Sequence, residues 1–392
     1  MSDTPPTAVD TALASYRELF PVCRDHVYLN HAAVSPTSTR VRDAVCAWMA
    51  RYTDRGILDE AAWEPEAASC RARAAGLIGA GADEIAIVRN TTHGLSLVAE
   101  GLDWRPGDRV AVATSVEYPS NVFAWQRLAS RGVEVDEISC PTSVGAVTAE
   151  AAAAALTPKT RLLSVSTAQF GTGGVTELAA VGEMCRRRGV LLCVDGIQSV
   201  GALELDVDEI GIHFLAADSH KWMLGVLGIG FAYIQRDMQE RVRPVMVGWK
   251  TVPEPFTFDG RFGLAPSALR YEEATLSQPL VVGMDAALAL IEEISVARIS
   301  AHVRALVERL AEGLSAIGCD VGPAPAHRRH ILTFSHPACA PEALLDYLSE
   351  RKIVISLRRG RLRASPHFYN TAAEIDRLVE VVAEAARAGL TG

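Results

Sequence analysis

The feature that most constrains the fold of this chain is a series of short apolar runs that alternate with helical stretches. Each run is apolar throughout instead of at every second residue, a pattern typical of a strand covered on both faces. Such strands predict an α/β fold with a mostly parallel sheet, whose ligands bind at the carboxyl ends of the strands. The runs are 85–88, 109–113, 161–166, 190–195 and 214–218, and the helical stretches among them are 93–101, 121–131, 148–156 and 176–188.

The rest of the chain follows other patterns. Periodic apolar residues predict helices over 37–53 and 63–79, and one long helix over 279–316. The stretch 235–280 is rich in Pro, Gly and aromatic residues and is expected to connect units or to cover a site. A compact α+β unit is predicted at the end, with strands at 331–335, 353–356 and 361–365 and helices at 341–351 and 371–389.

These patterns divide the chain into units. A length of 392 residues, 49% of them hydrophobic and 22% charged, suits a globular protein of two or three units. We predict an N-terminal segment, 1–27, that packs on a small unit. A large unit is predicted over 28–265, and the small C-terminal unit over 266–392.

Charge and hydropathy exclude several classes of partner. The chain has 38 Lys and Arg against 47 Asp and Glu, a net charge of −9, whereas binding to nucleic acid needs a basic field. No apolar run approaches the roughly 18 residues of a membrane-spanning helix, and the first residues lack the layout of a signal peptide. The chain is therefore expected to be cytoplasmic and to bind neither nucleic acid nor a membrane.

The cysteines and a histidine pair carry little sign of metal binding. Eight cysteines are scattered without any C-x-x-C pair, which favours buried thiols over disulfides or zinc. His327 and His330 have no third ligand at suitable spacing, so an exposed loop is predicted there and no metal site.

Two charged residues follow neighbouring strand runs. Asp195 ends the run 190–195, and Lys221 follows the run 214–218. A carboxylate at the end of a buried strand is costly unless it meets a cation, so both side chains are expected to face one pocket. Pyridoxal phosphate chemistry needs such a pair: a lysine that binds the cofactor and an acid that keeps its pyridine nitrogen protonated. Thr91 and Thr92 open the helix at 93–101, where free N–H groups and hydroxyls suit a phosphate.

Taken together, these motifs resemble the class V aminotransferase family of fold-type I pyridoxal-phosphate enzymes. The family includes cysteine desulfurases, selenocysteine lyases, C–S lyases and isopenicillin N epimerase. The resemblance runs from Tyr28-Leu-Asn-His-Ala-Ala33 to Arg363-Ala-Ser-Pro-His-Phe-Tyr-Asn-Thr371. It implies a large domain with a seven-stranded type of sheet, a small C-terminal α+β domain, and pyridoxal 5'-phosphate as the cofactor.

The resemblance also implies roles for single residues. Lys221 matches the lysine that binds the cofactor covalently, Asp195 the partner of the pyridine nitrogen, and Gln198 the donor to the phenolic oxygen. The implied phosphate ligands are Thr91, Thr92, the N–H of His93, Ser219 and His220. Tyr118 stands where the family often has a histidine stacked on the cofactor ring, and Gln169 lies close to a family asparagine. Thr275 matches a threonine that reaches the partner subunit's phosphate, which implies a homodimer.

At the substrate end, Arg363 matches the family's clamp for the α-carboxylate, and the fork of a guanidinium suits both oxygens. Asn30 and His31 are placed at the substrate by the same resemblance. The neighbouring Arg358, Arg359 and Arg361 are predicted to form a solvated basic edge. Desulfurases carry a nucleophilic cysteine on a loop shortly before the arginine, but 354–363 has neither the loop nor a cysteine.

The predicted function is a pyridoxal-phosphate enzyme that removes the Cα proton of an amino acid. We rank β-elimination at a C–S bond of a cysteine-type substrate first, because it needs no enzyme thiol. Transamination is the alternative, and epimerisation would need a second acid or base, for which Tyr118 is the candidate. A non-enzymatic protein on the same fold is disfavoured because the lysine, the aspartate, the phosphate donors and the arginine are all retained.

Overall fold

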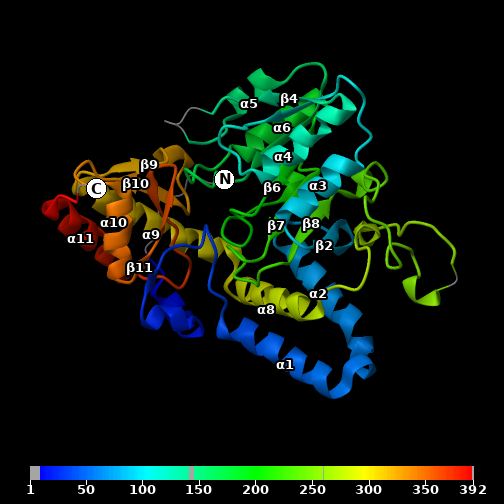
Figure 1. The fold of residues 1–392 in the computed structure, drawn as a ribbon, viewed down its shortest axis with the longest axis horizontal. Helices are drawn as coiled ribbons and strands as arrows, with labels where there is room; N and C mark the ends of the chain where they lie inside the picture. The colour runs from blue at the N-terminus through cyan, green and yellow to red at the C-terminus, as the bar shows by residue number, and fades with distance from the viewer. Residues whose placement is uncertain (1–8, 141–144, 259, 391–392) are drawn as a thin grey trace.

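The larger unit is built around a seven-stranded sheet with the order β2-β8-β7-β6-β5-β3-β4 (Figure 1). The computed structural model describes residues 9–140, 145–258 and 260–390. Apart from β8, which is antiparallel to β2 and β7, neighbouring strands pair in parallel. The strands are β2 (Ile85–Val88), β3 (Arg109–Val112), β4 (Glu134–Glu137), β5 (Thr160–Ser166), β6 (Leu191–Asp195), β7 (Phe214–Asp218) and β8 (Gly230–Ile234).

Each predicted apolar run of this unit forms a strand, which confirms the α/β fold, whereas two strands were not predicted. β4 has the charged sequence EVDE and lies at the edge of the sheet, so it carries no apolar run. β8 begins at Gly230, where an added Cβ would lie 2.2 Å from the carbonyl oxygen of Ala217. The glycine therefore lets β8 approach β7 closely.

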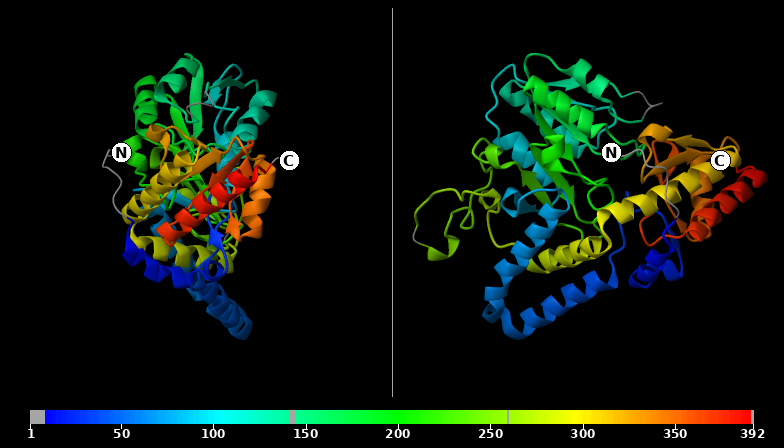
Figure 2. Two further views of the ribbon diagram at one scale, coloured as in Figure 1. Left: turned by 90° about the vertical axis from the view of Figure 1, so that its left-hand side faces the viewer. Right: turned by 180° about the vertical axis from the view of Figure 1, so that it is seen from behind.

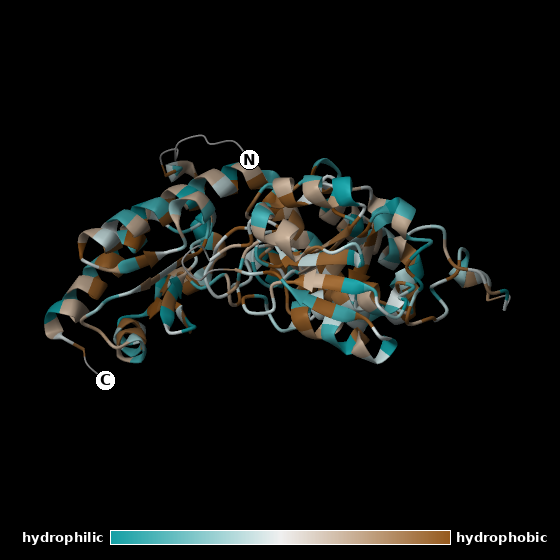
Figure 3. Cartoon of the chain, turned by 90° about the horizontal axis from the view of Figure 1, so that it is seen from above, coloured by the Kyte–Doolittle hydropathy of each residue, from teal (hydrophilic) through white to brown (hydrophobic). Residues whose placement is uncertain are grey.

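Helices cover both faces of this sheet, as buried strands require. One face packs against α2, α5 and α6 through residues such as Cys70, Ala152 and Val181. The other packs against α3 and α4 through Leu95 and Trp125. In Figure 3, hydrophobic residues concentrate on the strands between these layers. The helices of this unit are α1 (Thr39–Arg55), α2 (Trp63–Gly76), α3 (Thr91–Gly101), α4 (Ser120–Gln126), α5 (Ala149–Ala155), α6 (Leu178–Arg188) and α7 (Val207–Ile210).

The smaller unit has its own core on an antiparallel sheet of order β12-β13-β10-β9. Its strands are β9 (Asp320–Gly322), β10 (Leu332–Ser335), β12 (Ser356–Arg358) and β13 (Arg361–Ala364), and its helices are α9 (Val296–Ala316), α10 (Pro341–Glu350) and α11 (Ala372–Ala388). The N-terminal segment packs here: Phe20 stacks on Tyr369 with ring centroids 3.8 Å apart. β1 (Val27–Tyr28) pairs with β11 (Ile353–Val354). Residues 1–8 of the predicted segment lie outside the described residues.

The single helix predicted over 279–316 is wrong, because two helices meet at Ser295. α8 (Gln278–Ile294) ends where Ser295 takes a φ of 76°, and the Ser295 side chain accepts from the N–H of Arg298 to begin α9. The apolar period continues through the break, so the pattern alone does not reveal it.

α8 contributes to both cores. Val281, Met284 and Leu288 belong to the core of the larger unit, whereas Ile291 and Ile294 belong to that of the smaller unit. The predicted boundary at 265/266 would assign the whole helix to the small unit and stays a prediction.

The described residues of the stretch 235–280 form short 3₁₀ turns before α8, at 236–238, 255–257 and 268–271. Its middle projects from the larger unit in Figure 2 and exposes large aromatic side chains, with Phe258 at 74% and Phe262 at 73% exposure. No helix in the described parts of the chain is long and apolar enough to cross a membrane.

Candidate active site

A cavity of 510 Å³ opens at the carboxyl ends of β5, β6 and β7. Lys221 and Asp195 both line it, as the strand pattern predicts. Arg363 of β13 also reaches its wall, so the cavity lies where the two units meet.

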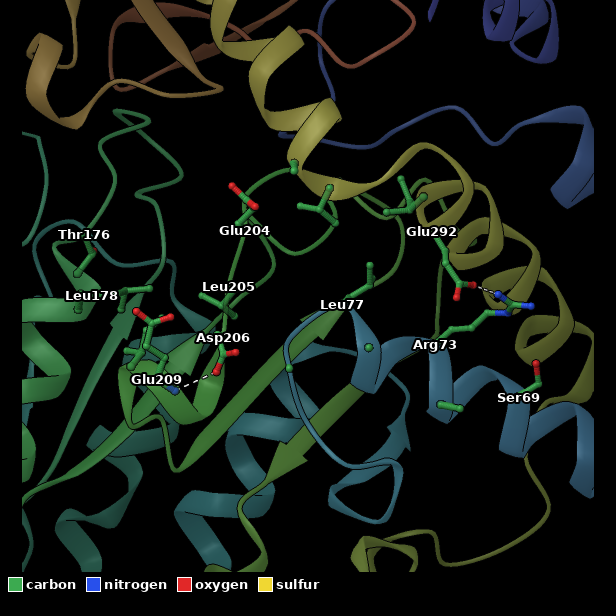
Figure 4. A pocket seen from close by; sticks show the side chains of 18 residues that line it. Ser69, Arg73, Leu77, Thr176, Leu178, Glu204, Leu205, Asp206, Glu209 and Glu292 are labelled. Carbon is green, nitrogen blue, oxygen red and sulfur yellow. Dashed lines mark hydrogen bonds and ion pairs between the residues drawn. The ribbon is translucent and has the colours of Figure 1, made fainter. Parts of the chain in front are cut away.

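A larger hollow of 890 Å³ lies elsewhere, between α2, α6 and the α8–α9 junction (Figure 4). Its charged side chains are mostly acidic, and its arginine, Arg73, forms ion pairs with Glu292 and Asp285. No lysine, histidine or cysteine lies among its described lining residues. The hollow therefore offers no lysine, histidine or thiol, and the smaller cavity, which holds Lys221, is the candidate active site.

Asp195 is buried, and Lys221 is half-buried in the wall of the cavity. Burial lowers the pKa of the Lys221 ammonium below its ordinary value, and the charge of Asp195 raises it again in part. Burial raises the pKa of the Asp195 carboxyl, which is 2% exposed and accepts from the N–H of Ile197 at 3.0 Å. Leu224, just after the lysine, takes a φ of 59°, a backbone conformation that non-glycine residues rarely adopt and that is often found at functional sites.

Asp218 joins the end of β7 to the start of α3. Its carboxylate accepts from the N–H of Thr91 at 2.8 Å, and its own N–H donates to the Thr91 hydroxyl at 3.0 Å. Burial raises the pKa of Asp218 to about 6. His220, on the same cavity wall, has a pKa lowered to about 4 by burial and by the charge of Lys221, so its imidazole is neutral near pH 7.

The predicted phosphate ligands divide into two sets. Thr92 lines the cavity, where its hydroxyl lies 2.8 Å from that of Ser120. The Nδ1 of His220 is buried, lies 3.6 Å from the Asp218 carboxylate, and has no hydrogen-bond partner among the described residues. By contrast, the N–H of His93 donates to the N-cap residue Asn90, and the Ser219 hydroxyl donates to the carbonyl of Val226 at 2.7 Å. Neither His93 nor Ser219 lines the cavity.

The two predicted glutamines lie at different depths. Gln198 lines the cavity, where its amide donates to the carbonyl of Ala32 at 3.1 Å and accepts from the Trp222 indole at 3.2 Å. Gln169 is buried behind the wall and donates to Glu117 at 3.0 Å. The Glu117 carboxylate also accepts from the N–H of Ser166 at 2.7 Å, so it organises the loop after β5.

Tyr118 stands at the mouth of the cavity and is 50% exposed. Its ring centroid lies 5.9 Å from Nζ of Lys221 and packs edge-on against Phe170 at 5.2 Å. The Tyr118 ring therefore presents a flat aromatic surface near the amine of Lys221.

Arg363 is a buried cation with free hydrogen-bonding capacity. It is 1% exposed, and one terminal nitrogen donates to the carbonyl of Phe170 at 2.5 Å. Its Nε and Nη2 have no hydrogen-bond partner among the described residues. Burial and the neighbouring charge of Arg358 lower its pKa to about 9, so it is still charged near pH 7. A buried cation in this state suits an anionic ligand.

Three further predicted site residues also lie outside the cavity lining. His31 is fully buried behind it, with its ring nitrogens at the Ser365 carbonyl (2.7 Å) and the Tyr369 hydroxyl (2.5 Å). Asn30 forms a β-bridge with Ser365, and Thr275 is exposed on the loop before α8. The geometry of one subunit therefore gives no support to direct ligand contacts by these three.

Side chains of the smaller unit donate to backbone carbonyls of the larger one beside the cavity, among them His327, His330, Arg363 and His367. His367 Nε2 lies 3.0 Å from the Trp222 carbonyl, and His327 Nδ1 lies 3.2 Å from that of Val175. His330 donates to the Gln198 carbonyl. The expected exposed loop at 327–330 is therefore wrong for His330, which is fully buried because it joins the units.

Sequence reasoning missed several cavity residues. Asp218 and Ser120 line the cavity but have no role in the sequence analysis, although Asp218 ends a buried strand as Asp195 does. Arg358 was predicted to be solvated, yet it lines the cavity beside Arg363. Of the eight cysteines, all free, Cys46 is exposed and Cys23 half-buried, against the expectation of buried thiols, and none lines the cavity. No group of three or more His, Cys, Asp or Glu in the described ranges could hold a metal ion.

The residues present fit pyridoxal phosphate. The cavity combines a half-buried lysine, a buried carboxylate, hydroxyls at the start of α3, and nitrogens of His220 and Arg363 that have no hydrogen-bond partner among the described residues. Lys221 would bind the aldehyde carbon, Asp195 would face the pyridine nitrogen, and Thr92 with His220 would hold the phosphate.

Fold and site together define a pyridoxal-phosphate enzyme. The model of the family described as aminotransferase class-V matches residues 27–378, and the chain belongs to that family. The resemblance inferred from the motifs is thereby confirmed, as are the enzyme class and the cofactor.

Several similar proteins are named for sulfur chemistry. The chain is 32% identical to a probable cysteine desulfurase of Methanothermobacter thermautotrophicus, over 95% of this chain and 98% of the relative. The structure of a cysteine desulfurase from Thermococcus onnurineus superimposes with a TM-score of 0.87 at 25% identity, over 99% of this chain and 100% of the other. The cystine C–S lyase C-DES, in complex with cysteine persulfide, superimposes with a TM-score of 0.86 at 26% identity, over 93% and 99%. A variant of that lyase has glycine covalently linked to the pyridoxal-phosphate cofactor.

Proposed function

We propose that this enzyme cleaves the Cβ–S bond of an S-substituted cysteine by β-elimination. The overall reaction converts R–S–CH₂–CH(NH₃⁺)–COO⁻ and water into R–SH, pyruvate and ammonium. When bound, pyridoxal phosphate supplies an electron-withdrawing ring that takes up the electron pair left at Cα. The observation that carries the proposal is a half-buried lysine, a buried carboxylate and an incompletely paired arginine on one cavity, without a thiol among its described lining residues.

Each residue has a defined task in this reaction. Arg363 binds the α-carboxylate with the nitrogens that have no protein partner. The amine of Lys221, whose pKa is lowered by burial, accepts the Cα proton in its neutral form. The ionised Asp195 keeps positive charge on the ring nitrogen. The electron pair of the broken Cβ–S bond leaves with sulfur, which takes up a proton.

The short β12–β13 hairpin favours elimination over sulfur transfer to the enzyme. Transfer of sulfur to an enzyme thiol leaves the bond's electron pair on Cβ and yields alanine, so it needs a cysteine that reaches the substrate. Between Val354 and Arg363 the chain holds only two short strands and a two-residue turn, without a cysteine. Transamination is the second candidate, since it uses the same lysine, carboxylate and arginine.

The test is a product assay on the purified holoenzyme with S-methylcysteine and with cysteine. Elimination predicts pyruvate, ammonium and thiol in equal amounts, whereas alanine would indicate desulfuration and overturn the proposal. Loss of cofactor absorbance that a keto acid restores would indicate transamination. Lys221→Ala should abolish both the absorbance band and pyruvate formation, and Lys159→Ala, at an exposed position, is the matched control.

We also infer that the enzyme is a homodimer in which Thr275 serves the partner's site. Its exposed position outside the cavity of its own subunit is consistent with such a role. Large apolar side chains are exposed on the projecting loop, as Phe258 and Phe262 show, and on α1, as Tyr52 shows. Light scattering after gel filtration should give twice the 42.0 kDa chain mass, and a monomer would contradict this inference.

A further inference from the structure

A second arginine enters the active-site cavity because the β12–β13 hairpin is short. Arg359 and Gly360 join the strands with φ values of 51° and 74°, and positive φ at both central residues is what a type I′ turn requires. The register pairs Ser356 with Arg363 and Arg358 with Arg361. Paired residues project to one face, so Arg358 and Arg363 share a face about 7 Å apart along the strands.

Neither arginine meets a protein carboxylate. The Arg358 guanidinium donates to the carbonyl of Leu357 at 2.8 Å, and no acidic side chain in the described parts of the chain forms an ion pair with it. Arg361 on the same hairpin instead pairs with Asp320 at 2.6 Å. Arg358 and Arg363 carry like charges on one wall of the cavity, and their repulsion adds to burial in lowering the pKa of Arg363.

Two arginine side chains on the wall of one cavity favour a ligand that carries two anionic groups. In the proposed function, Arg363 binds the α-carboxylate, which leaves Arg358 without a counterion. A second acid placed beyond the sulfur would enter the cavity on the same side as the first, since both arginines line it. Such an acid would relieve the repulsion between the two guanidinium groups and form charge-assisted hydrogen bonds with Arg358.

We propose that Arg358 selects amino acids whose sulfur substituent carries a carboxylate. The inference rests on the proposed function and names the substrate class of the same site. A thioether acid and a disulfide acid share this chemistry. In either case the carboxylate leaves with the departing sulfur after the Cβ–S bond breaks, so Arg358 binds the leaving group and not the part that becomes pyruvate.

The test compares S-carboxymethylcysteine with its neutral amide, S-carbamoylmethylcysteine, which has nearly the same shape. Binding to the holoenzyme is followed through the cofactor absorbance. The acid is expected to bind about ten- to a hundredfold more tightly than the amide. Arg358→Gln should remove this preference and leave the affinity for the amide unchanged, while Arg358→Lys should keep part of it. Arg359→Asn removes the same charge from an exposed neighbour outside the cavity and should keep the full preference.

The outcomes separate the two proposals. Equal binding of acid and amide to the wild type, or equal weakening of both in Arg358→Gln, would overturn the role of Arg358. Failure of both amino acids to bind would overturn the proposed function itself. The mixed disulfides of cysteine with mercaptoacetate and with mercaptoacetamide repeat the comparison for a disulfide. If the enzyme prefers the acid over the amide only among the mixed disulfides, the substrate is a disulfide acid. If it prefers the acid only among the thioethers, the substrate is a thioether acid.

Discussion

His367 Nε2 lies 3.0 Å from the carbonyl oxygen of Trp222, the residue that follows Lys221. A buried side chain of the smaller unit thus holds the backbone beside the proposed base. Both residues are fully buried, so water cannot replace this bond. Removing the donor would leave the Trp222 carbonyl unpaired in the core.

Replacement of His367 should therefore cost both stability and cofactor. His367→Leu is expected to lower the free energy of unfolding by about 1–3 kcal/mol, the cost of an unsatisfied buried group. His367→Gln keeps a donor of similar reach and should lose less. Urea denaturation measures the stability and dialysis the retention of cofactor. Equal losses in the two variants would show that ring packing, not the hydrogen bond, is what matters.

Acid should destabilise the protein through three buried histidines. Burial lowers the pKa of His31 and His330 to about 4 and holds that of His367 well below its ordinary value, against 6.5 in an unfolded chain. As the pH falls from 6.5 to 4, the unfolded chain takes up protons that the folded one excludes, so stability is lost in this window. Each histidine contributes about 1.4 kcal/mol per pH unit at most. Urea denaturation across these pH values should show a shallower slope in His330→Gln.

Cofactor uptake should depend on the pH in a way that reports on Lys221. Only the neutral amine reacts with an aldehyde, and burial lowers the pKa of Lys221 below 10.5. The rate at which cofactor-free protein binds pyridoxal phosphate should rise with pH and level off below 10.5. Asp195→Asn removes the charge that raises the lysine pKa, so its midpoint should shift to lower pH. A rate that still climbs at pH 10.5 in the wild type would contradict the burial of this amine.

Replacement of Arg363 should weaken substrate binding without lowering the stability of the fold. Arg363→Ala is expected to weaken amino-acid binding about a hundredfold or more, because the α-carboxylate loses its charged partner. Cofactor absorbance should persist. Arg363→Met should be at least as stable as the wild type without substrate, because a buried cation with unpaired nitrogens is replaced by an apolar side chain. Absorbance titration and urea denaturation measure the two effects, and unchanged amino-acid affinity would contradict the assignment.

The sequence predicts those site residues that directly follow the carboxyl ends of strands. Asp195 and Lys221 follow buried apolar runs, and parallel strands bring their carboxyl ends to one edge. Arg358 could not be placed in this way, because its position depends on positive φ at Arg359, a residue type that rarely adopts it. His330 was misplaced for a related reason: its role depends on the Gln198 carbonyl of a distant loop, and carbonyl positions leave no trace in side-chain patterns.

The packing of α8 in both cores should make the two units unfold together. Because Met284 packs in one core and Ile291, two turns later, in the other, neither unit can lose the helix and keep its interior filled. Expression of either half alone should give an aggregating fragment wherever the chain is cut. Heat should melt the intact subunit in a single calorimetric transition, with a van't Hoff enthalpy equal to the measured one. In thermodynamic terms the chain is then one folding unit, although its structure contains two units with separate sheets.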